Sequence, residues 1–248
     1  MKTPVNNEDV LGGFFKFGGK PILDGPKYEI SLKSAGNMSF HWGVENAVRT
    51  SFLTKIADKR QNIVSVELIH SKIVCVATSE NLLNGIKADG ILTQEKNLIP
   101  VITVADCMPI FLYHHKSGTF GVLHSGWKGT GIVEEALKLA ENKWHLDIED
   151  FSVVLGPHIQ DCCYTVDSER AEYFTKNFGA ESVQKTQNGF SLSLTNANLY
   201  LLKIAGIPKE NIIVHNECTV CDKRFFSFRR DAGKVGIPFS VQAAYVKW

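Results

Sequence analysis

The sequence lacks a long uncharged apolar segment, an excess of charge of either sign, and the cysteine density of a disulfide-rich protein. The longest apolar stretch of the 248 residues, 98–113, carries Asp106 and two prolines and is too short to span a bilayer. Lys plus Arg number 27 and Asp plus Glu 26, and this net charge of +1 argues against a basic nucleic-acid-binding protein. Six cysteines at this size are no disulfide framework. The polar start shows no export signal, so we expect a cytoplasmic protein with free or metal-bound thiols.

The sequence also lacks a Pro/Gly/Ser linker, a low-complexity run and an internal repeat, which predicts one domain over residues 1–248. Hydrophobic spacing predicts helices over 46–58, 129–144 and 168–178, and a strand leading into a helix over 191–207. Apolar segments predict strands within 62–70, 72–78, 88–93, 100–106, 108–115, 119–126, 151–159, 211–217, 225–231 and 239–247. Because several strands follow one another directly, the pattern favours an α/β (mixed α+β) fold with a mixed β-sheet core layered with helices.

Three potential metal ligands stand at the ends of strand-like segments. His70 closes VSVELIH, Cys107 lies between two apolar runs, and His124 precedes a glycine turn. Functional groups concentrate at such ends because the backbone holds them rigidly. Two imidazoles and a thiolate would suit a zinc ion with an open fourth position, where a bound water has a pKa of about 7. Two other interpretations stay open: hydrogen-bonded histidines with a buried structural cysteine, or a Cys-His nucleophilic pair without metal.

The other cysteines give a weaker signal. Cys218 and Cys221 form a C-x-x-C pair, which as a zinc half-site needs a second pair. The adjacent residues Cys162 and Cys163 are a poor candidate for it. Since no amphipathic helix follows Cys221, a thioredoxin-type motif is disfavoured too, and structural thiols are the favoured interpretation.

Two features could hold an anion. The segment FFSFRRD (225–231), taken as a strand, directs Arg229 and Arg230 to opposite faces, so one could bind phosphate while the other forms an ion pair. The glycine-rich segment 124–132 leads into a helix, and its amides could hold phosphate or carboxylate. It carries neither the P-loop nor the dinucleotide-binding pattern.

Taken together, several motifs resemble one family. TVADCMPIFLY (103–113), VLHSGWKGTGIVEEAL (122–137), LGPHIQDCCYTV (155–166) and ECTVCDKRFFSFRRDAGKVG (217–236) follow ADGILT (88–93) in order. Family members show T-A-D-C-x-P, H-x-G-W-[RK]-G, G-P-x-I-x-x-C-C-Y and F-F-S-[YF]-R-R-D. Over about residues 60–236 the chain resembles the polyphenol oxidase/laccase-domain family, also called peptidoglycan editing factor or purine nucleoside phosphorylase-like proteins. Residues 1–60 diverge from the family pattern.

The resemblance implies a zinc site made by His70, Cys107 and His124, with copper as another occupant. It implies a purine nucleoside phosphorylase that acts on adenosine, inosine and S-methyl-5′-thioadenosine, with adenosine deaminase activity. Arg49 matches a family arginine that contacts phosphate. We expect purine nucleosides and phosphate as partners, neither nucleic acid nor membrane, and a monomer or homodimer.

Deamination needs a proton shuttle, for which the sequence offers Asp106 and Asp89; either could instead orient a ligand histidine. Three alternatives remain: a Cys-His hydrolase or editing factor in cell-wall peptidoglycan metabolism, a copper polyphenol oxidase, and a non-enzymatic metal-binding regulator. The eight histidines include no His-x-His pair, which argues against a four-copper laccase built from one chain.

Overall fold

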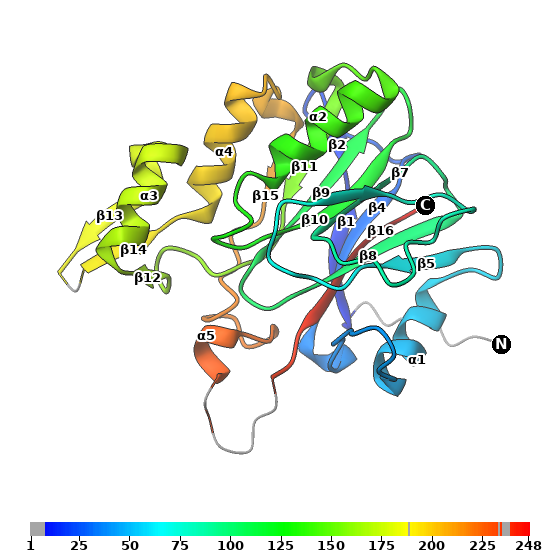
Figure 1. The fold of residues 1–248 in the computed structure, drawn as a ribbon, viewed down its shortest axis with the longest axis horizontal. Coiled ribbons are helices and arrows are strands. Elements are labelled where there is room, and N and C mark those ends of the chain that lie inside the picture. The colour runs from blue at the N-terminus through cyan, green and yellow to red at the C-terminus, as the bar shows by residue number, and fades with distance from the viewer. Residues whose placement is uncertain (1–7, 188, 233, 235–238) are drawn as a thin grey trace.

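The structure, a computed structural model, describes residues 8–187, 189–232, 234 and 239–248. Most of the polar start and part of the GKVG sequence that ends the last motif lie outside these residues. Two large β-sheets occupy the centre of the molecule (Figure 1). The first has the strand order β1 (Val10–Phe14), β4 (Lys27–Ser31), β16 (Gln242–Lys247), β8 (Leu98–Val104) and β5 (Asn62–Ser65). The second has the order β15 (Ile212–Val214), β11 (Phe151–Leu155), β9 (Met108–His114), β10 (Phe120–Ser125), β7 (Gly90–Thr93) and β6 (Val74–Val76).

The remaining elements are two small sheets and the helices. A three-stranded sheet has the order β12 (Thr165–Val166), β14 (Gly189–Leu192) and β13 (Val183–Thr186), and β2 (Lys16–Phe17) pairs with β3 (Lys20–Pro21). The α-helices of the described chain are α1 (Ala47–Ile56), α2 (Ile132–Trp144), α3 (Ser168–Phe178), α4 (Leu194–Ile204) and α5 (Phe228–Asp231). None of these helices combines the length and the apolarity needed to cross a bilayer.

The two large sheets pack face to face, with helices on their outer sides. One buried cluster joins side chains of β4, β8 and β16 to side chains of β9 and β10, and so fills the space between the sheets. A second cluster joins β9, β10 and β11 to α2 and α4, and a third joins β8 and β16 to α1. Figure 1 shows α2 and α4 on one side of the sheets and α1 on the other. The prediction of a mixed sheet core layered with helices is therefore confirmed, because β5–β8, β6–β7 and β11–β15 are parallel pairs among antiparallel ones.

The longest apolar stretch of the sequence forms two central strands, one in each sheet. Every residue of β9 is buried, and β8 has a single half-buried position, because each strand is covered on both faces. The chain passes from the first sheet to the second between β8 and β9. Asp106 and Cys107 lie at this crossover, where the backbone leaves both sheets and side chains can face a crevice.

Most predicted elements are present, and two predictions are wrong. The predicted helix over 168–178 is α3, and Asp167 caps it, since its carboxylate accepts from Arg170 N at 2.7 Å. The segment FFSFRRD is not a strand: the Ser227 hydroxyl accepts from Arg230 N at 3.1 Å and starts α5. Strand β5 ends at Ser65, so His70 lies in a loop rather than at a strand end.

Candidate functional site

Three residues from separate parts of the chain converge beside this crossover. His70, Cys107 and His124 offer ligand atoms that all lie within 4.8 Å of one another. The two imidazole ring centroids are 4.9 Å apart. Cys107 directly precedes β9, and His124 lies on the neighbouring strand β10, opposite Pro109 of β9. Strand pairing therefore fixes two members of the group, while a loop brings the third.

A fully buried carboxylate, Asp89, holds both histidines in place. Its oxygens accept from His124 Nδ1 at 2.9 Å, from His70 N at 2.9 Å and from Ser71 N at 2.6 Å. Since a carboxylate only accepts, the His124 Nδ1 carries the proton, and Nε2 is left to act as a ligand or base. This carboxylate–histidine arrangement is typical of metal sites, where it fixes the orientation of the ligand.

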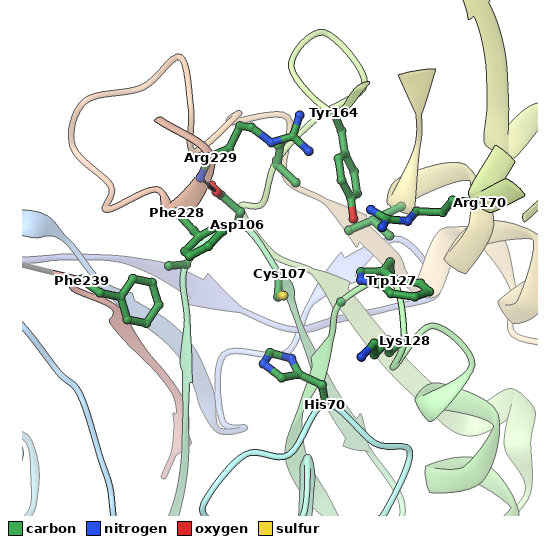
Figure 2. Close-up of a pocket in the computed structure, with 14 residues that line it drawn as sticks. His70, Asp106, Cys107, Trp127, Lys128, Tyr164, Arg170, Phe228, Arg229 and Phe239 are labelled. Carbon is green, nitrogen blue, oxygen red and sulfur yellow. Dashed lines mark hydrogen bonds between the residues drawn. The ribbon is translucent and has the colours of Figure 1, made fainter. Parts of the chain in front are cut away.

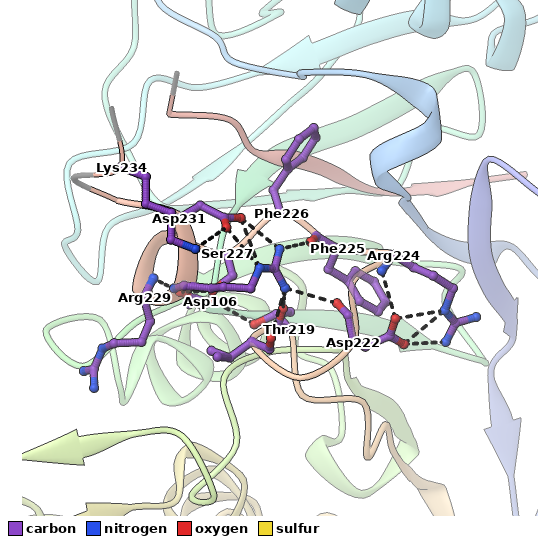
Figure 3. A network of polar contacts seen from close by, with 12 residues as sticks. Asp106, Thr219, Asp222, Arg224, Phe225, Phe226, Ser227, Arg229, Asp231 and Lys234 are labelled. Carbon is purple, nitrogen blue, oxygen red and sulfur yellow. Dashed lines mark hydrogen bonds and ion pairs between the residues drawn. The ribbon is translucent and has the colours of Figure 1, made fainter. Parts of the chain in front are cut away.

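The other aspartate of the site, Asp106, anchors the segment that begins α5. Its carboxylate accepts from Thr219 Oγ1 at 2.6 Å, from Ser227 Oγ at 3.0 Å and from Arg229 N at 2.6 Å (Figure 3). Asp106 also has a φ of 76°, and His70 one of 57°, both in the left-handed region that few residues other than glycine adopt. Such backbone conformations persist only where surrounding bonds enforce them. Hydrogen bonds to aspartates thus fix the loops on both sides of the site.

The charges within the group favour an ionised cysteine. Burial raises the pKa of the Cys107 thiol, but the positive charge of His124 and hydrogen bonds from His124 and His70 outweigh it and lower the pKa to about 6. Burial also opposes charge on His124, whereas the Cys107 thiolate and Asp89 together raise the pKa of its imidazole to about 9. In the metal-free protein at neutral pH, the geometry therefore favours a thiolate–imidazolium pair.

This pairing predicts the pH dependence of thiol alkylation. After metal is removed with a chelator, Cys107 should react with iodoacetamide with a midpoint near pH 6, because only the thiolate attacks. Peptide mass spectrometry would follow each cysteine separately. Cys75 is the internal control, because burial raises the pKa of its thiol and delays its reaction to alkaline pH. A Cys107 midpoint at or above that of Cys75 would contradict the ion pair.

The donor set fits a metal ion. Two imidazole nitrogens and one thiolate are borderline-soft ligands that suit zinc or copper, and three protein ligands leave a position open. Gly126 makes room beside them, since a Cβ atom at this position would lie 2.6 Å from Cys107 Sγ. Hydrogen bonds to Asp89 hold the two histidines of the ligand set, and His70 and Cys107 line a pocket.

The pocket has a volume of about 540 Å³ and combines aromatic, cationic and metal-ligating side chains. Its lining comprises His70, Ala105, Asp106, Cys107, Gly126, Trp127, Lys128, Ile159, Tyr164, Arg170, Leu194, Phe228, Arg229 and Phe239. Figure 2 shows Cys107 near the centre, with Phe228 and Phe239 on one side and Trp127, Tyr164 and Arg170 on the other.

Three cationic side chains line the pocket, and they differ in how far neighbouring groups engage them. The guanidinium of Arg229 donates to the backbone oxygens of Cys163 and Thr165. Arg170 lies 4.3 Å from the Trp127 ring centroid and 3.9 Å from the Asp167 carboxylate. Lys128 is exposed at the rim, with its Nζ 5.4 Å from the centroid of the Trp127 ring.

The predicted anion-binding arginines do not all reach this pocket. Arg229 lines it, as the hypothesis of one anion-binding arginine requires. Arg230 instead forms an ion pair with Asp231 at 2.9 Å and donates to the carbonyl oxygens of Thr219 and Phe225. Arg49 is buried, donates to Met38 O and Ser65 Oγ, and lines a different hollow of the described chain.

Sequence reasoning missed several of the lining residues. Trp127, Lys128 and Tyr164 lie within the motifs HSGWKG and GPHIQDCCY. The motifs identify these segments, but they do not show that these three side chains line a pocket. Arg170 carried no signal, because it lies on α3 and reaches the pocket only through tertiary packing.

Four other cysteines, Cys162, Cys163, Cys218 and Cys221, also converge. The interpretation of Cys162 and Cys163 as a poor second half of a metal site is therefore corrected. Their sulfurs and those of Cys218 and Cys221 all lie within 4.8 Å of one another. The structure thus contains two separate groups of potential metal ligands, of which the His/Cys/His group contributes His70 and Cys107 to the pocket lining.

Comparisons with known proteins agree with this architecture. The purine nucleoside phosphorylase YlmD of Geobacillus stearothermophilus is 31% identical over 219 residues, which cover 81% of this chain and 80% of that protein. The protein of the same name from Bacillus subtilis is 37% identical over 156 residues, which cover 60% of this chain and 55% of that protein. The crystal structure of YlmD from Geobacillus stearothermophilus superposes with a TM-score of 0.81 at 26% identity, over 95% of this chain and 98% of the other.

The family profile described as "Multi-copper polyphenol oxidoreductase laccase" matches residues 34–243. This range includes every residue of the His/Cys/His group and both aspartates that support it. The chain therefore belongs to the multi-copper polyphenol oxidoreductase laccase family.

Proposed function

We propose that the chain is a purine nucleoside phosphorylase that uses zinc held by His70, Cys107 and His124. Its substrates would be inosine, adenosine and S-methyl-5′-thioadenosine, and the same site would deaminate adenosine. The observation that carries the proposal is the meeting of a three-ligand group, three cations and a set of aromatic side chains in one pocket. The names of the relatives from Geobacillus stearothermophilus and Bacillus subtilis support the reaction class.

The size and lining of the pocket suit a nucleoside. A volume of about 540 Å³ lies within the range of small-molecule sites. Trp127, Tyr164, Phe228 and Phe239 offer faces on which a purine can stack. Cys107 and His70 lie between these aromatic groups, so a base held among them would be close to the ligand set (Figure 2).

Phosphorolysis requires that the phosphate is positioned and that charge in the transition state is stabilised. A phosphate oxygen forms a bond to the ribose C1′ while the bond from C1′ to the purine nitrogen breaks, and the base leaves with the electron pair and takes up a proton. Lys128, Arg170 and Arg229 would hold the phosphate dianion and direct it at C1′. The same cations would stabilise the negative charge that is redistributed in the transition state.

A zinc ion at the three-ligand group would supply a Lewis acid and activate water at neutral pH, as deamination of adenosine requires. The side chains of the protein would then orient the metal ligands and transfer protons. Asp89 holds the His124 ring and is fully buried, so we assign it positioning rather than proton transfer. Asp106 is engaged by three donors on both oxygens, which likewise supports a positioning role.

A turnover assay tests the proposal directly. Purified protein is incubated with inosine or adenosine, with and without phosphate, and the products are separated by chromatography. We expect phosphate-dependent release of the free base together with ribose 1-phosphate, and inosine from adenosine without phosphate. Absence of both products from folded, zinc-loaded protein would refute the proposal.

Lys128 offers a sharper test of the phosphate site. Lys128→Met should raise KM for phosphate by about 10- to 100-fold, because a hydrogen bond to a charged group contributes about 1.5–3 kcal/mol. KM for the nucleoside should change little, since the aromatic side chains remain. Lys138→Met, on the exposed face of α2, is the matched control and should leave both constants unchanged. Equal effects of the Lys128 change on both KM values would contradict a phosphate role.

One observation favours a second candidate, a metal-independent Cys-His hydrolase. Cys107, His124 and Asp89 form a thiolate, imidazolium and carboxylate series, and the pKa of the thiol is lowered to about 6. Such a series also activates cysteine nucleophiles. Metal content separates the two functions: the hydrolase would retain full activity after zinc is removed, whereas the phosphorylase would lose its activity and regain it when zinc is restored.

A further inference from the structure

The second cysteine group lies where two loops leave neighbouring parallel strands. Strand β11 pairs with β15 in parallel, with Leu155 opposite Val214. The loop after β11 carries Cys162 and Cys163, and the loop after β15 carries Cys218 and Cys221. Because the carboxyl ends of parallel strands meet at the same edge of a sheet, both loops start side by side.

The separations between the sulfurs match a shared metal ion. Cys163 Sγ lies 3.4 Å from Cys221 Sγ, Cys162 Sγ lies 3.9 Å from Cys221 Sγ, and the sulfurs of Cys162 and Cys163 are 3.7 Å apart. Four thiolates around zinc at a Zn–S distance of about 2.3 Å lie about 3.8 Å from one another. A disulfide would instead bring two sulfurs to about 2.05 Å. These three separations, together with a Cys218 sulfur within 4.8 Å of the other three, are compatible with four thiolates around one ion.

The backbone around Cys218 supports the same geometry. A short parallel bridge joins His158 to Cys218, and Thr219 N donates to His158 O at 3.0 Å. The Gln160 N–H group approaches Cys218 Sγ at 3.5 Å, and Asp222 N donates to Cys218 O at 2.8 Å, which closes the C-x-x-C turn. Backbone donors to a coordinating sulfur orient it and stabilise its negative charge.

We propose that Cys162, Cys163, Cys218 and Cys221 bind a second, structural zinc ion. Four protein ligands close the coordination sphere, as in structural sites, whereas the His/Cys/His group leaves a position open. This proposal goes beyond the enzymatic one and does not depend on it.

The second ion would hold one wall of the pocket together. Tyr164, which lines the pocket, directly follows Cys163, and Arg229 of the pocket donates to Cys163 O at 3.3 Å. Thr219, next to Cys218, donates to Asp106 at 2.6 Å. Joining the two cysteine loops therefore restrains side chains that come from three separate segments of the lining.

Metal analysis of matched variants tests the site without reference to activity. We expect about two zinc ions per chain in the wild type and about one in each of the single variants Cys221→Ser and Cys107→Ala. The double variant that combines these two substitutions should bind none. Cys75→Ser is the control, because this cysteine belongs to neither group, and should retain about two. Equal zinc in Cys221→Ser and the wild type would overturn the proposal.

A measurement on the unaltered chain covers the case in which the variants fail to fold. Cobalt(II) substitution should give the intense visible bands of a tetrahedral thiolate site, and the denatured protein should show six free thiols by intact mass. A mass lower by two hydrogens, with a disulfide among these four cysteines, would show that the group is a redox pair and would overturn the metal site.

Discussion

Cys107→Ala is expected to reduce kcat/KM for phosphorolysis of inosine by about 1,000-fold or more. The change removes the sulfur ligand, and a bound metal contributes several kcal/mol of transition-state stabilisation, each 1.36 kcal/mol of which is about tenfold in rate. Zinc at the His/Cys/His group should be lost in parallel, as measured by elemental analysis. Steady-state kinetics at saturating phosphate would give the rate effect.

The matched control is Cys75→Ala, which also removes a half-buried thiol but lies on β6 outside both ligand groups. It should leave kcat/KM within about twofold of the wild type, because Cys75 belongs to neither proposed zinc site and does not line the pocket. Loss of zinc without loss of activity in Cys107→Ala would show that the metal has no part in the reaction. Retention of both would show that Cys107 is not a ligand.

Asp89→Asn is expected to weaken zinc binding by about 10- to 100-fold, the usual effect of removing a carboxylate that supports a histidine ligand. Asp89 Oδ1 accepts from the His124 ring and from His70 N, while Oδ2 accepts from Ser71 N, and an amide would replace one of these two acceptors by a nitrogen that only donates. Activity should fall at limiting zinc and return toward the wild-type value as zinc is raised. Isothermal titration of the metal-free protein would measure the affinity.

Asp150→Asn provides the comparison for a buried carboxylate elsewhere. Asp150 contacts Lys116 at 2.6 Å and precedes β11, whose first residue pairs with His114 at the end of β9 farthest from Cys107. It should lower stability without changing zinc affinity. If both Asp89→Asn and Asp150→Asn kept the zinc affinity of the wild type, Asp89 would have no role in positioning the metal ligands.

The sequence predicts the site residues best where a potential metal ligand lies at or next to a buried strand. Cys107 directly precedes β9 and His124 lies near the end of β10, so their convergence follows from the pairing of these adjacent strands. The sequence predicts His70 at a strand end, whereas it lies in a loop that Asp89 holds through backbone amides. The strand-end pattern indicates these three residues, but it does not reveal the hydrogen bonds that position them.

The errors arose where distant segments decide the outcome. The aromatic-rich segment 225–231 predicts a strand, but the Ser227 cap and the hydrogen bond from Arg229 N to Asp106 start a helix instead. The four-cysteine group depends on the parallel pairing of β11 with β15, which short-range patterns do not reveal. Arg170 reaches the pocket from α3 for the same kind of reason.

The most direct test of the account is anomalous diffraction at the zinc edge, on crystals of protein purified without added metal. We predict a peak about 2.0–2.3 Å from one imidazole nitrogen each of His70 and His124 and from Cys107 Sγ. A protein that catalyses phosphorolysis at its full rate while its crystals show no such peak would contradict the account.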